Sequence, residues 1–296
     1  MESSSPFSRD PKGSASPPKI HLSANTYGKS DIRLTKVVRK GTRHELLEFS
    51  VDIALSVDFA DSYLQGDNSK IVATDSMKNT VYVVAKENDF SSAEEFAILL
   101  AEHFPRTYSH VQSATVQIRQ TYWNRIPSNG KPHDHAFVCA GPELHTAAAK
   151  SPPSSITGGL SNLLVLKTTN SAFKDFLTDR FRTLKDTDDR IFATSVTADW
   201  DYTSPTVDFP AAHEKIRTAL LEVFATHMSY AVQQTMFEMG KAALSACPQI
   251  KEIRLICPNK HRIPINLQPF GLENKNEIFV WTDEPFGNIT ATVTRE

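Results

Sequence analysis

Alternating apolar and polar residues predict pairs of strands along the chain, and stretches with helical spacing follow each pair. In the first half the predicted elements are, in order, a hairpin of residues 31–39 and 45–57 turning at 40–43, helices 76–86 and 92–103, and strands 111–123 and 132–139 joined through Asn129-Gly130. A capping box of Ser92 and Glu95 opens the second helix.

The second half repeats this order. Its predicted elements are strands 163–168 and 190–200, helices 211–226 and 231–244, and strands 250–257, 278–282 and 289–293. The repeat predicts an α+β fold of two tandem units, each an antiparallel four-stranded sheet with both helices on one face. Because residues 150–154 are rich in Pro and Ser, we expect one domain over residues 21–150 and a second over 151–296.

The junction between residues 70 and 80 is the most informative segment. Residues 70–73, which include the β-branched Ile71 and Val72, predict a strand end, after which Asp75 or Ser76 can cap the next helix. Thr74 lies between the two elements, where a rigidly held hydroxyl could face a cleft or could simply be one more turn residue.

Composition excludes several classes of protein. Of the 296 residues 22% are charged, and the formal net charge is −2, with no basic block, so we expect no nucleic-acid partner. No apolar run reaches the roughly 18–20 residues of a membrane span. The three cysteines, Cys139, Cys247 and Cys257, have no CxxC spacing and are expected to be reduced thiols of an intracellular protein.

The two termini give weaker indications. Residues 1–20 are dominated by Ser, Pro, Gly and charge, which predicts a disordered tail or a remnant of cloning. The chain ends at Glu296 without a Ser-Lys-Leu signal, which favours the cytoplasm, while a truncated chain could still be peroxisomal.

Six short motifs, together with the tandem plan, resemble urate oxidase. They are YGKSDIRL (27–34), VATDSMKNT (72–80), NSAF (170–173), DDRIFAT (188–194), AVQQTM (231–236) and PNKH (258–261), and they occur in the order and spacing of that family. The resemblance extends from Tyr27 to the C-terminus. It implies two tunnelling-fold domains and a homotetramer around a central channel. It also implies oxidation of urate by molecular oxygen to 5-hydroxyisourate and hydrogen peroxide, with neither metal nor organic cofactor.

The resemblance also implies the site. Phe173 would stack on the flat anionic ring, Arg190 would clamp one edge with two parallel donors, and Gln233 with the Val232 backbone would hold the opposite edge. The implied urate-binding residues are Thr74, Asp75, Phe173, Arg190, Val232, Gln233 and Asn259.

A proton relay of Lys29, Thr74 and His261 would supply the base that oxygen chemistry requires. Burial lowers the pKa of a lysine amine, which allows it to accept a proton. In the family the Lys and Thr come from one subunit and the other site residues from its neighbour, so activity would depend on assembly.

Each residue also has a structural alternative. Phe173 could be a core aromatic residue near Phe176, and Arg190 could form a strand-end ion pair with Asp186, Asp188 or Asp189. Lys29, Gln233 and His261 could be ordinary surface residues or, for the histidine, a satisfied loop residue.

Other functions receive less support. His133-Asp134-His135 falls short of a closed metal site, and neither a GxGxxG or GxxxxGK[ST] loop nor a GxSxG elbow occurs. Another tunnelling-fold purine or pterin enzyme would need a zinc site or a glutamate where Gln233 stands. A non-catalytic purine-binding protein would have no use for the relay.

Overall fold

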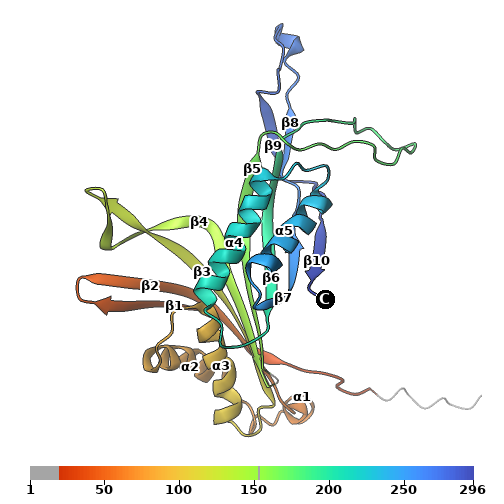
Figure 1. Ribbon diagram of the computed structural model, residues 1–296. Coiled ribbons are helices and arrows are strands. Elements are labelled where there is room, and N and C mark those ends of the chain that lie inside the picture. Colours follow the sequence, from red (N-terminus) through yellow and green to blue (C-terminus); the bar gives the residue numbers. More distant parts are fainter. Residues whose placement is uncertain (1–19, 153) are drawn as a thin grey trace, which may run out of the picture.

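Groups of strands alternate with groups of helices in the computed structural model, which describes residues 20–152 and 154–296 (Figure 1). The first half contains β1 (Tyr27–Lys40), β2 (Arg43–Ser56), α1 (Ala60–Gln65), α2 (Thr74–Glu87), α3 (Ala93–Thr107), β3 (Ser113–Ser128) and β4 (Lys131–Ser151). The second half contains β5 (Ser155–Lys167), β6 (Phe192–Tyr202), α4 (Phe209–Thr226), α5 (Val232–Ala246), β7 (Ile250–Ile256), β8 (His261–Pro264), the 3₁₀ turn η1 (Gln268–Phe270), β9 (Phe279–Thr282) and β10 (Thr290–Thr294). Apart from Ile20, the predicted tail of residues 1–20 lies outside the described residues.

Eight of the strands form one antiparallel sheet in the order β1-β2-β3-β4-β5-β6-β7-β10. Each half of the chain contributes four neighbouring strands, which confirms the predicted α+β class and the tandem arrangement. β4 and β5 pair from Leu144↔Ser161 to Lys150↔Ser155. The segment predicted to link two domains is therefore a hairpin turn inside the sheet, and the domain boundary at residue 150 remains a prediction.

One predicted sheet strand belongs elsewhere. Residues 279–282 form β9, which pairs only with β8 in a separate two-stranded sheet. This small sheet stands out from the body of the molecule next to the long loop that connects β5 to β6 (Figure 1). β10 takes the edge position instead, and it pairs with β7 from Thr290↔Ile256 to Thr294↔Glu252.

The predicted turns fit the backbone conformations that they require. Gly41 has φ +63° in the β1–β2 turn, and Asn129 and Gly130 have φ +51° and +74° in the β3–β4 turn. Such left-handed conformations favour Gly and Asn, which is why these residues predicted the hairpins.

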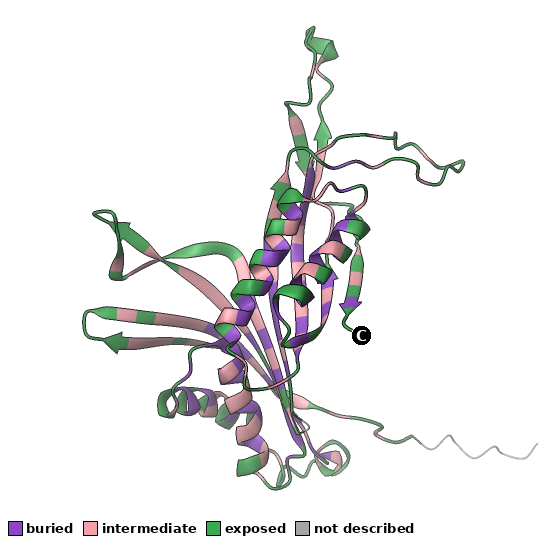
Figure 2. Cartoon of the chain, in the orientation of Figure 1, coloured by how far each residue is buried: buried purple, intermediate pink, exposed green. Residues whose placement is uncertain are grey.

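The helices cover one face of the sheet, with α2 and α3 over the first half and α4 and α5 over the second (Figure 1). Their buried residues face the strands and their exposed residues face away, as Figure 2 shows. The capping prediction for α3 is confirmed, because the Glu95 N–H donates to Ser92 Oγ at 3.1 Å. The Glu95 carboxylate accepts a hydrogen bond from the Ser91 N–H at 2.6 Å rather than from the Ser92 N–H.

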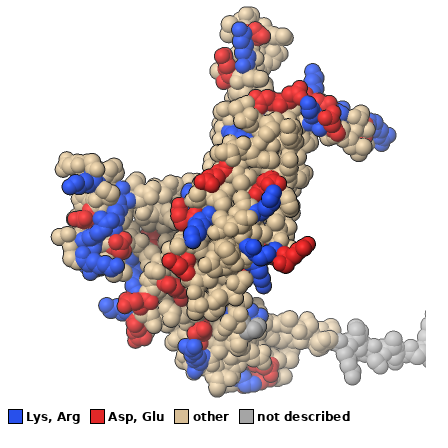
Figure 3. All heavy atoms as spheres, in the orientation of Figure 1, with Lys and Arg blue, Asp and Glu red and all other residues tan. Residues whose placement is uncertain are grey.

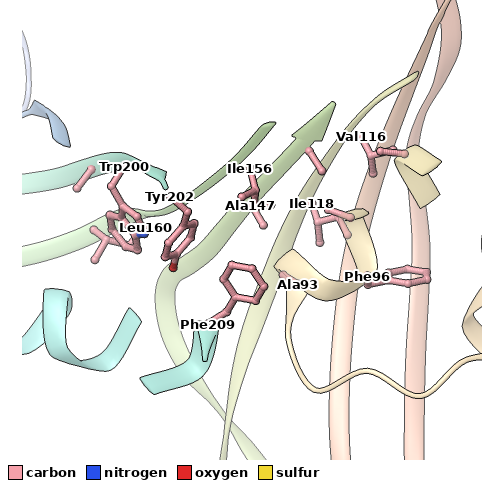
Figure 4. Packing of buried hydrophobic residues seen from close by; sticks show 14 of the residues in the cluster. Ala93, Phe96, Val116, Ile118, Ala147, Ile156, Leu160, Trp200, Tyr202 and Phe209 are labelled. Carbon is pink, nitrogen blue, oxygen red and sulfur yellow. The ribbon is translucent and has the colours of Figure 1, made fainter. Parts of the chain in front are cut away.

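A single hydrophobic core runs under both halves of the sheet (Figure 4). Phe96 of α3 and Trp200 of β6 are both 0% exposed. Between them, Phe209 at the start of α4 packs edge-on against Tyr202, with ring centroids 4.9 Å apart. Burial of each such side chain stabilises the fold by about 1.5–3 kcal/mol. The core therefore ties the two halves together.

The prediction for residues 70–76 was wrong in two respects. Residues 70–73 form no strand. The apolar side chain of Val72 is instead buried in the hydrophobic core. α2 begins at Thr74 with Ala73 as its N-cap and no side-chain cap. The Asp75 carboxylate instead accepts hydrogen bonds from Lys78 and Asn79 within the helix.

Basic and acidic side chains are interspersed over the face that carries the helices (Figure 3). Within residues 20–152 and 154–296, no helix is long and apolar enough to cross a membrane.

Candidate functional site

The predicted site residues fall into two groups on different parts of the sheet. The Lys29 group consists of Lys29 on β1 and Thr74 and Asp75 at the start of α2. The Arg190 group lies before β6, at the start of α5 and after β7, and consists of Phe173, Arg190, Val232, Gln233, Asn259 and His261.

In the Lys29 group, the start of α2 is held against β1. The Val72 N–H donates to the Tyr27 hydroxyl at 2.7 Å, and that hydroxyl donates to the Val72 carbonyl at 3.0 Å. Lys29 is half-buried and Thr74 is exposed, so both side chains are accessible to a ligand. The hydrogen bond from Lys78 lowers the pKa of Asp75, and the positive charge of Lys29 is among the smaller causes.

α2 also presents its N-terminus beside Lys29. The N–H groups in the first turn of a helix have no intrahelical acceptors and carry a partial positive charge. A helix start next to a lysine is therefore a favourable environment for an anion.

In the Arg190 group, the loop before β6 is tied to the loop before α5. The Ala172 N–H donates to the Ser229 carbonyl at 2.8 Å, and the Arg190 N–H donates to the Ser171 carbonyl at 2.8 Å. These bonds bring both ends of the β5–β6 loop to the N-terminus of α5.

Arg190 lies over the Phe173 ring, with its guanidinium carbon 4.9 Å from the ring centroid. Its Nε is buried and has no hydrogen-bond partner among the described residues, and burial lowers the pKa of its guanidinium. Within residues 20–152 and 154–296, Arg190 does not form the ion pair that was its alternative role. The three candidate carboxylates bind other groups, since Asp186 pairs with Arg182, Asp188 with Lys174, and Asp189 with the Thr169 hydroxyl.

Phe173 lies in an irregular loop rather than in a helix. Its ring nevertheless stacks on Phe176, with centroids 4.6 Å apart and an interplanar angle of 15°. Phe173 is half-buried, so part of its ring remains available for stacking with a ligand.

Asn259 and His261 reach the same region through strand contacts. Asn259 bridges Thr194 near the start of β6, and its N–H donates to the Gly287 carbonyl at 3.0 Å. His261 opens β8, where it pairs with Thr282. Between them, the Lys260 N–H donates to the Ala193 carbonyl of β6 at 2.9 Å, so both residues lie close to the strand that Arg190 precedes.

Val232 and Gln233 form the first turn of α5, whose N-cap is Ala231. Val232 is buried and Gln233 is exposed. The free N–H groups of this turn and the Gln233 amide can both meet a polar ligand edge.

The two groups do not meet within one chain. β1 is one edge strand, whereas β6 and β7 lie toward the opposite edge of the sheet. Among residues 20–152 and 154–296, no hydrogen bond or ion pair joins Lys29, Thr74 or Asp75 to the Arg190 group.

Some supporting residues were not predicted as parts of the site. Ser171 and Ser229 hold the site segments through backbone groups, and Tyr27 holds one through its side-chain hydroxyl, so none of the three leaves a distinctive spacing in the sequence. Tyr27 could have been noticed because it lies two residues before Lys29 on the same strand, and residues two apart on a strand point to the same face.

The two histidines of the weighed metal motif lie close together on β4. His133 and His135 are neighbours with ring centroids 4.5 Å apart, and His133 Nδ1 accepts a hydrogen bond from the His135 N–H. Within the described part of the chain no three His, Cys, Asp or Glu side chains form a group that could hold a metal ion.

Comparison with known proteins gives a consistent result. The family model described as Uricase matches residues 25–150 and 156–290. The chain is 42% identical over 280 residues to the uricase of Arthrobacter globiformis, covering 94% of this chain and 91% of the relative. It is 39% identical over 277 residues to the uricase of Dictyostelium discoideum, covering 92% and 96% of the two chains.

A solved structure extends this similarity to three dimensions. The crystal structure of the Arthrobacter globiformis uricase superposes with a TM-score of 0.90 at 42% identity, covering 94% of this chain and 96% of the other. With the matched family model and two relatives above 30% identity over nearly their whole length, the chain belongs to the uricase family.

Proposed function

We propose that this protein oxidises urate with molecular oxygen and water to 5-hydroxyisourate and hydrogen peroxide. Two electrons pass from urate to oxygen, which takes up two protons, and water supplies the hydroxyl group at carbon 5. The family membership supports urate as the substrate, and the residues of both groups supply the chemistry.

The observation that carries the proposal is Arg190 Nε, which is buried without a hydrogen-bond partner among the described residues, beside the Phe173 ring. A buried donor without an acceptor costs about 1–3 kcal/mol, more for a charged group, and a ligand that supplies an acceptor removes this cost. A flat anion with acceptors on its rim fits both features, because it can stack on Phe173 while it accepts from the guanidinium.

The other residues of the Arg190 group complete the grip. Gln233 and the Val232 backbone would hold the edge of urate opposite Arg190. Asn259 would donate and accept above the ring, where oxygen and then water must lie.

Lys29 and Thr74 would act as the base. Removal of a further proton makes bound urate rich enough in electrons to reduce oxygen. The Thr74 hydroxyl would relay the proton between the ligand or a water and Lys29, and His261 would exchange protons with Lys29.

The site would form between subunits of a homotetramer. The Lys29 group of one chain and the Arg190 group of another would then face each other, because a single chain keeps them apart. Asp75 and the start of α2 would add the partial positive charge that an anionic substrate requires.

No metal or organic cofactor is needed for these roles. The direct test is to treat the purified protein with a chelator and follow urate absorbance, oxygen uptake and peroxide release under air. We expect consumption of urate with equal amounts of oxygen and peroxide.

Flat urate absorbance in a correctly assembled tetramer would contradict the catalytic proposal and favour a purine-binding protein. Activity that disappears with the chelator and returns with added metal would contradict cofactor independence.

A further inference from the structure

Tyr27 holds two segments together through one hydroxyl group. Its oxygen accepts from the Val72 N–H at 2.7 Å and donates to the Val72 carbonyl at 3.0 Å. The hydroxyl thus replaces the strand partner that residues 70–73 lack. Its ring is fixed as well, since it packs edge-on against Phe59 with centroids 4.4 Å apart.

Along the chain, each end of this contact lies two residues before one member of the proposed base. Tyr27 precedes Lys29 by two residues, and Val72 precedes Thr74 by two residues. Residues two apart on a strand point to the same face, so Tyr27 and Lys29 project from one side of β1. A bond between Tyr27 and Val72 therefore limits the separation of Lys29 from Thr74.

A β-bulge fixes Lys29 from its other side. Lys29 pairs with Ile53 and Ile32 pairs with Val51, so β1 has one more residue than β2 between these pairs. Asp31 has φ +55° in this bulge. Bulges redirect neighbouring side chains and occur often beside active sites.

Four hydrogen bonds hold the bulge in place. The Asp31 N–H donates to Asp52 Oδ1 at 2.6 Å, and the Ser50 hydroxyl donates to Asp31 Oδ1 at 2.6 Å. Arg119 in turn donates to Asp52 Oδ2 at 2.6 Å and to Ser50 Oγ at 2.9 Å. Lys29 is thus held between a hydroxyl contact and a fixed bulge.

We infer that Tyr27 and the Asp31–Asp52 bulge are positioning elements that hold Lys29 and Thr74 at their working separation before a neighbouring subunit brings the substrate. This inference rests on the proposed function of Lys29 and Thr74 as the base. Tyr27 itself bonds to the backbone and not to the substrate.

The main test replaces Tyr27 with Phe, which keeps the ring against Phe59 and removes both hydrogen bonds to Val72. We expect kcat to fall about 10- to 100-fold, as for small misplacements of catalytic groups. KM, and the Kd of the non-oxidisable analogue 8-azaxanthine, should change less than about two-fold, since the Arg190 group is untouched. The pH profile of kcat should shift, because it reports the base in the complex. Tyr63→Phe, at an exposed tyrosine of α1, is the matched control.

A double-mutant cycle separates positioning from general destabilisation. Combined with Thr74→Ala, the Tyr27→Phe change should cost little further turnover, because the pair that it positions is already broken. If both costs multiply in full, or if Tyr27→Phe alone retains kcat within about two-fold, the inference is wrong.

A second variant tests the inference independently if Tyr27→Phe fails to assemble. Asp52→Asn keeps an acceptor for the Asp31 N–H but loses the charge that faces Arg119, and it should also lower kcat with KM unchanged. Unchanged kcat in this variant would overturn the role of the bulge. Full turnover by Lys29→Met would instead overturn the proposed base, which is a distinct outcome.

Discussion

The Arg190 guanidinium carbon lies 4.9 Å from the centroid of the Phe173 ring, while Arg190 Nε has no hydrogen-bond partner in the described part of the chain. The two side chains come from opposite ends of one loop, whose backbone is closed by bonds at Ser171 and Ser229. An aromatic face and a planar donor are thereby fixed together before any ligand arrives. This arrangement reduces the ordering cost of binding a flat anion.

Arg190→Lys should weaken binding before it weakens chemistry. A lysine cannot supply two parallel donors, so we expect the Kd of 8-azaxanthine and the KM for urate to rise about 10-fold or more. Arg182→Lys is a matched control, because Arg182 also lies over a phenylalanine ring, that of Phe176, but its donors are already bound. An unchanged Kd for Arg190→Lys would contradict the clamp.

Lys29→Met and Thr74→Ala should lower kcat more than they weaken ligand binding. Each removes a member of the proposed base, so we expect kcat to fall by about 10²- to 10⁴-fold with analogue binding largely retained. Lys86→Met, at an exposed lysine in the last turn of the same helix α2, serves as the control. Equal losses of kcat and of analogue binding would indicate a role in substrate positioning.

Mixed assemblies should recover activity that neither parent has. If Lys29→Met and an Arg190→Gln variant are refolded together in equal amounts, roughly a quarter of the sites should combine an intact Lys29 with an intact Arg190. Activity assays before and after mixing measure this recovery, and the Lys29→Met, Arg190→Gln double variant mixed with itself is the control. Absence of recovery in mixed tetramers would contradict a site shared between subunits.

His213 should make the fold sensitive to acid. Burial, and next the neighbouring His145, hold the pKa of His213 well below its ordinary value. Its ring lies 4.0 Å from His145, and Nε2 lies 3.2 Å from the Tyr122 hydroxyl, with Arg217 also nearby. Below about pH 6.5 the unfolded chain therefore binds a proton at this position that the folded chain does not.

Stability should accordingly decrease as the pH falls from about 6.5 toward 5. In His213→Asn we expect a flatter dependence of Tm on pH over this range, even if the absolute Tm is lower. His21→Asn, at an exposed histidine, should keep the wild-type slope. A parallel slope in His213→Asn would show that other groups control the acid sensitivity.

Local signals in the sequence predicted local structure well. Ser92 and Glu95 marked the start of α3, and Gly41 and Asn129 marked two hairpin turns, because each of these effects operates within a few residues. The repeated order of elements predicted the α+β class, because each element in that order was recognised from its own local pattern.

The errors arose where distant parts of the chain decide the structure. Residues 70–73 have a strand-like composition, but Val72 is bound by the Tyr27 side chain, 45 residues away, instead of by a neighbouring strand. A short apolar run cannot distinguish these cases. Likewise, nothing local in β9 shows that its partner is β8 and not the main sheet.

The candidate site divides in the same way. Resemblance to a family nominated its residues, but their grouping depends on long-range pairing, such as that of Asn259 with Thr194. The separation of Lys29 from Arg190 follows from the order of strands in the sheet, which spacing along the chain does not reveal.

Gly28, between Tyr27 and Lys29, should not tolerate substitution, although it is exposed to solvent. A Cβ atom built there would lie 1.7 Å from the Ile53 carbonyl oxygen and 2.8 Å from its carbon, so even alanine would force β1 away from β2. Surface positions normally accept many residues, and Gly28 counts as exposed. A library of random variants selected for activity should therefore return glycine alone at this position, while exposed neighbours such as Ser30 vary.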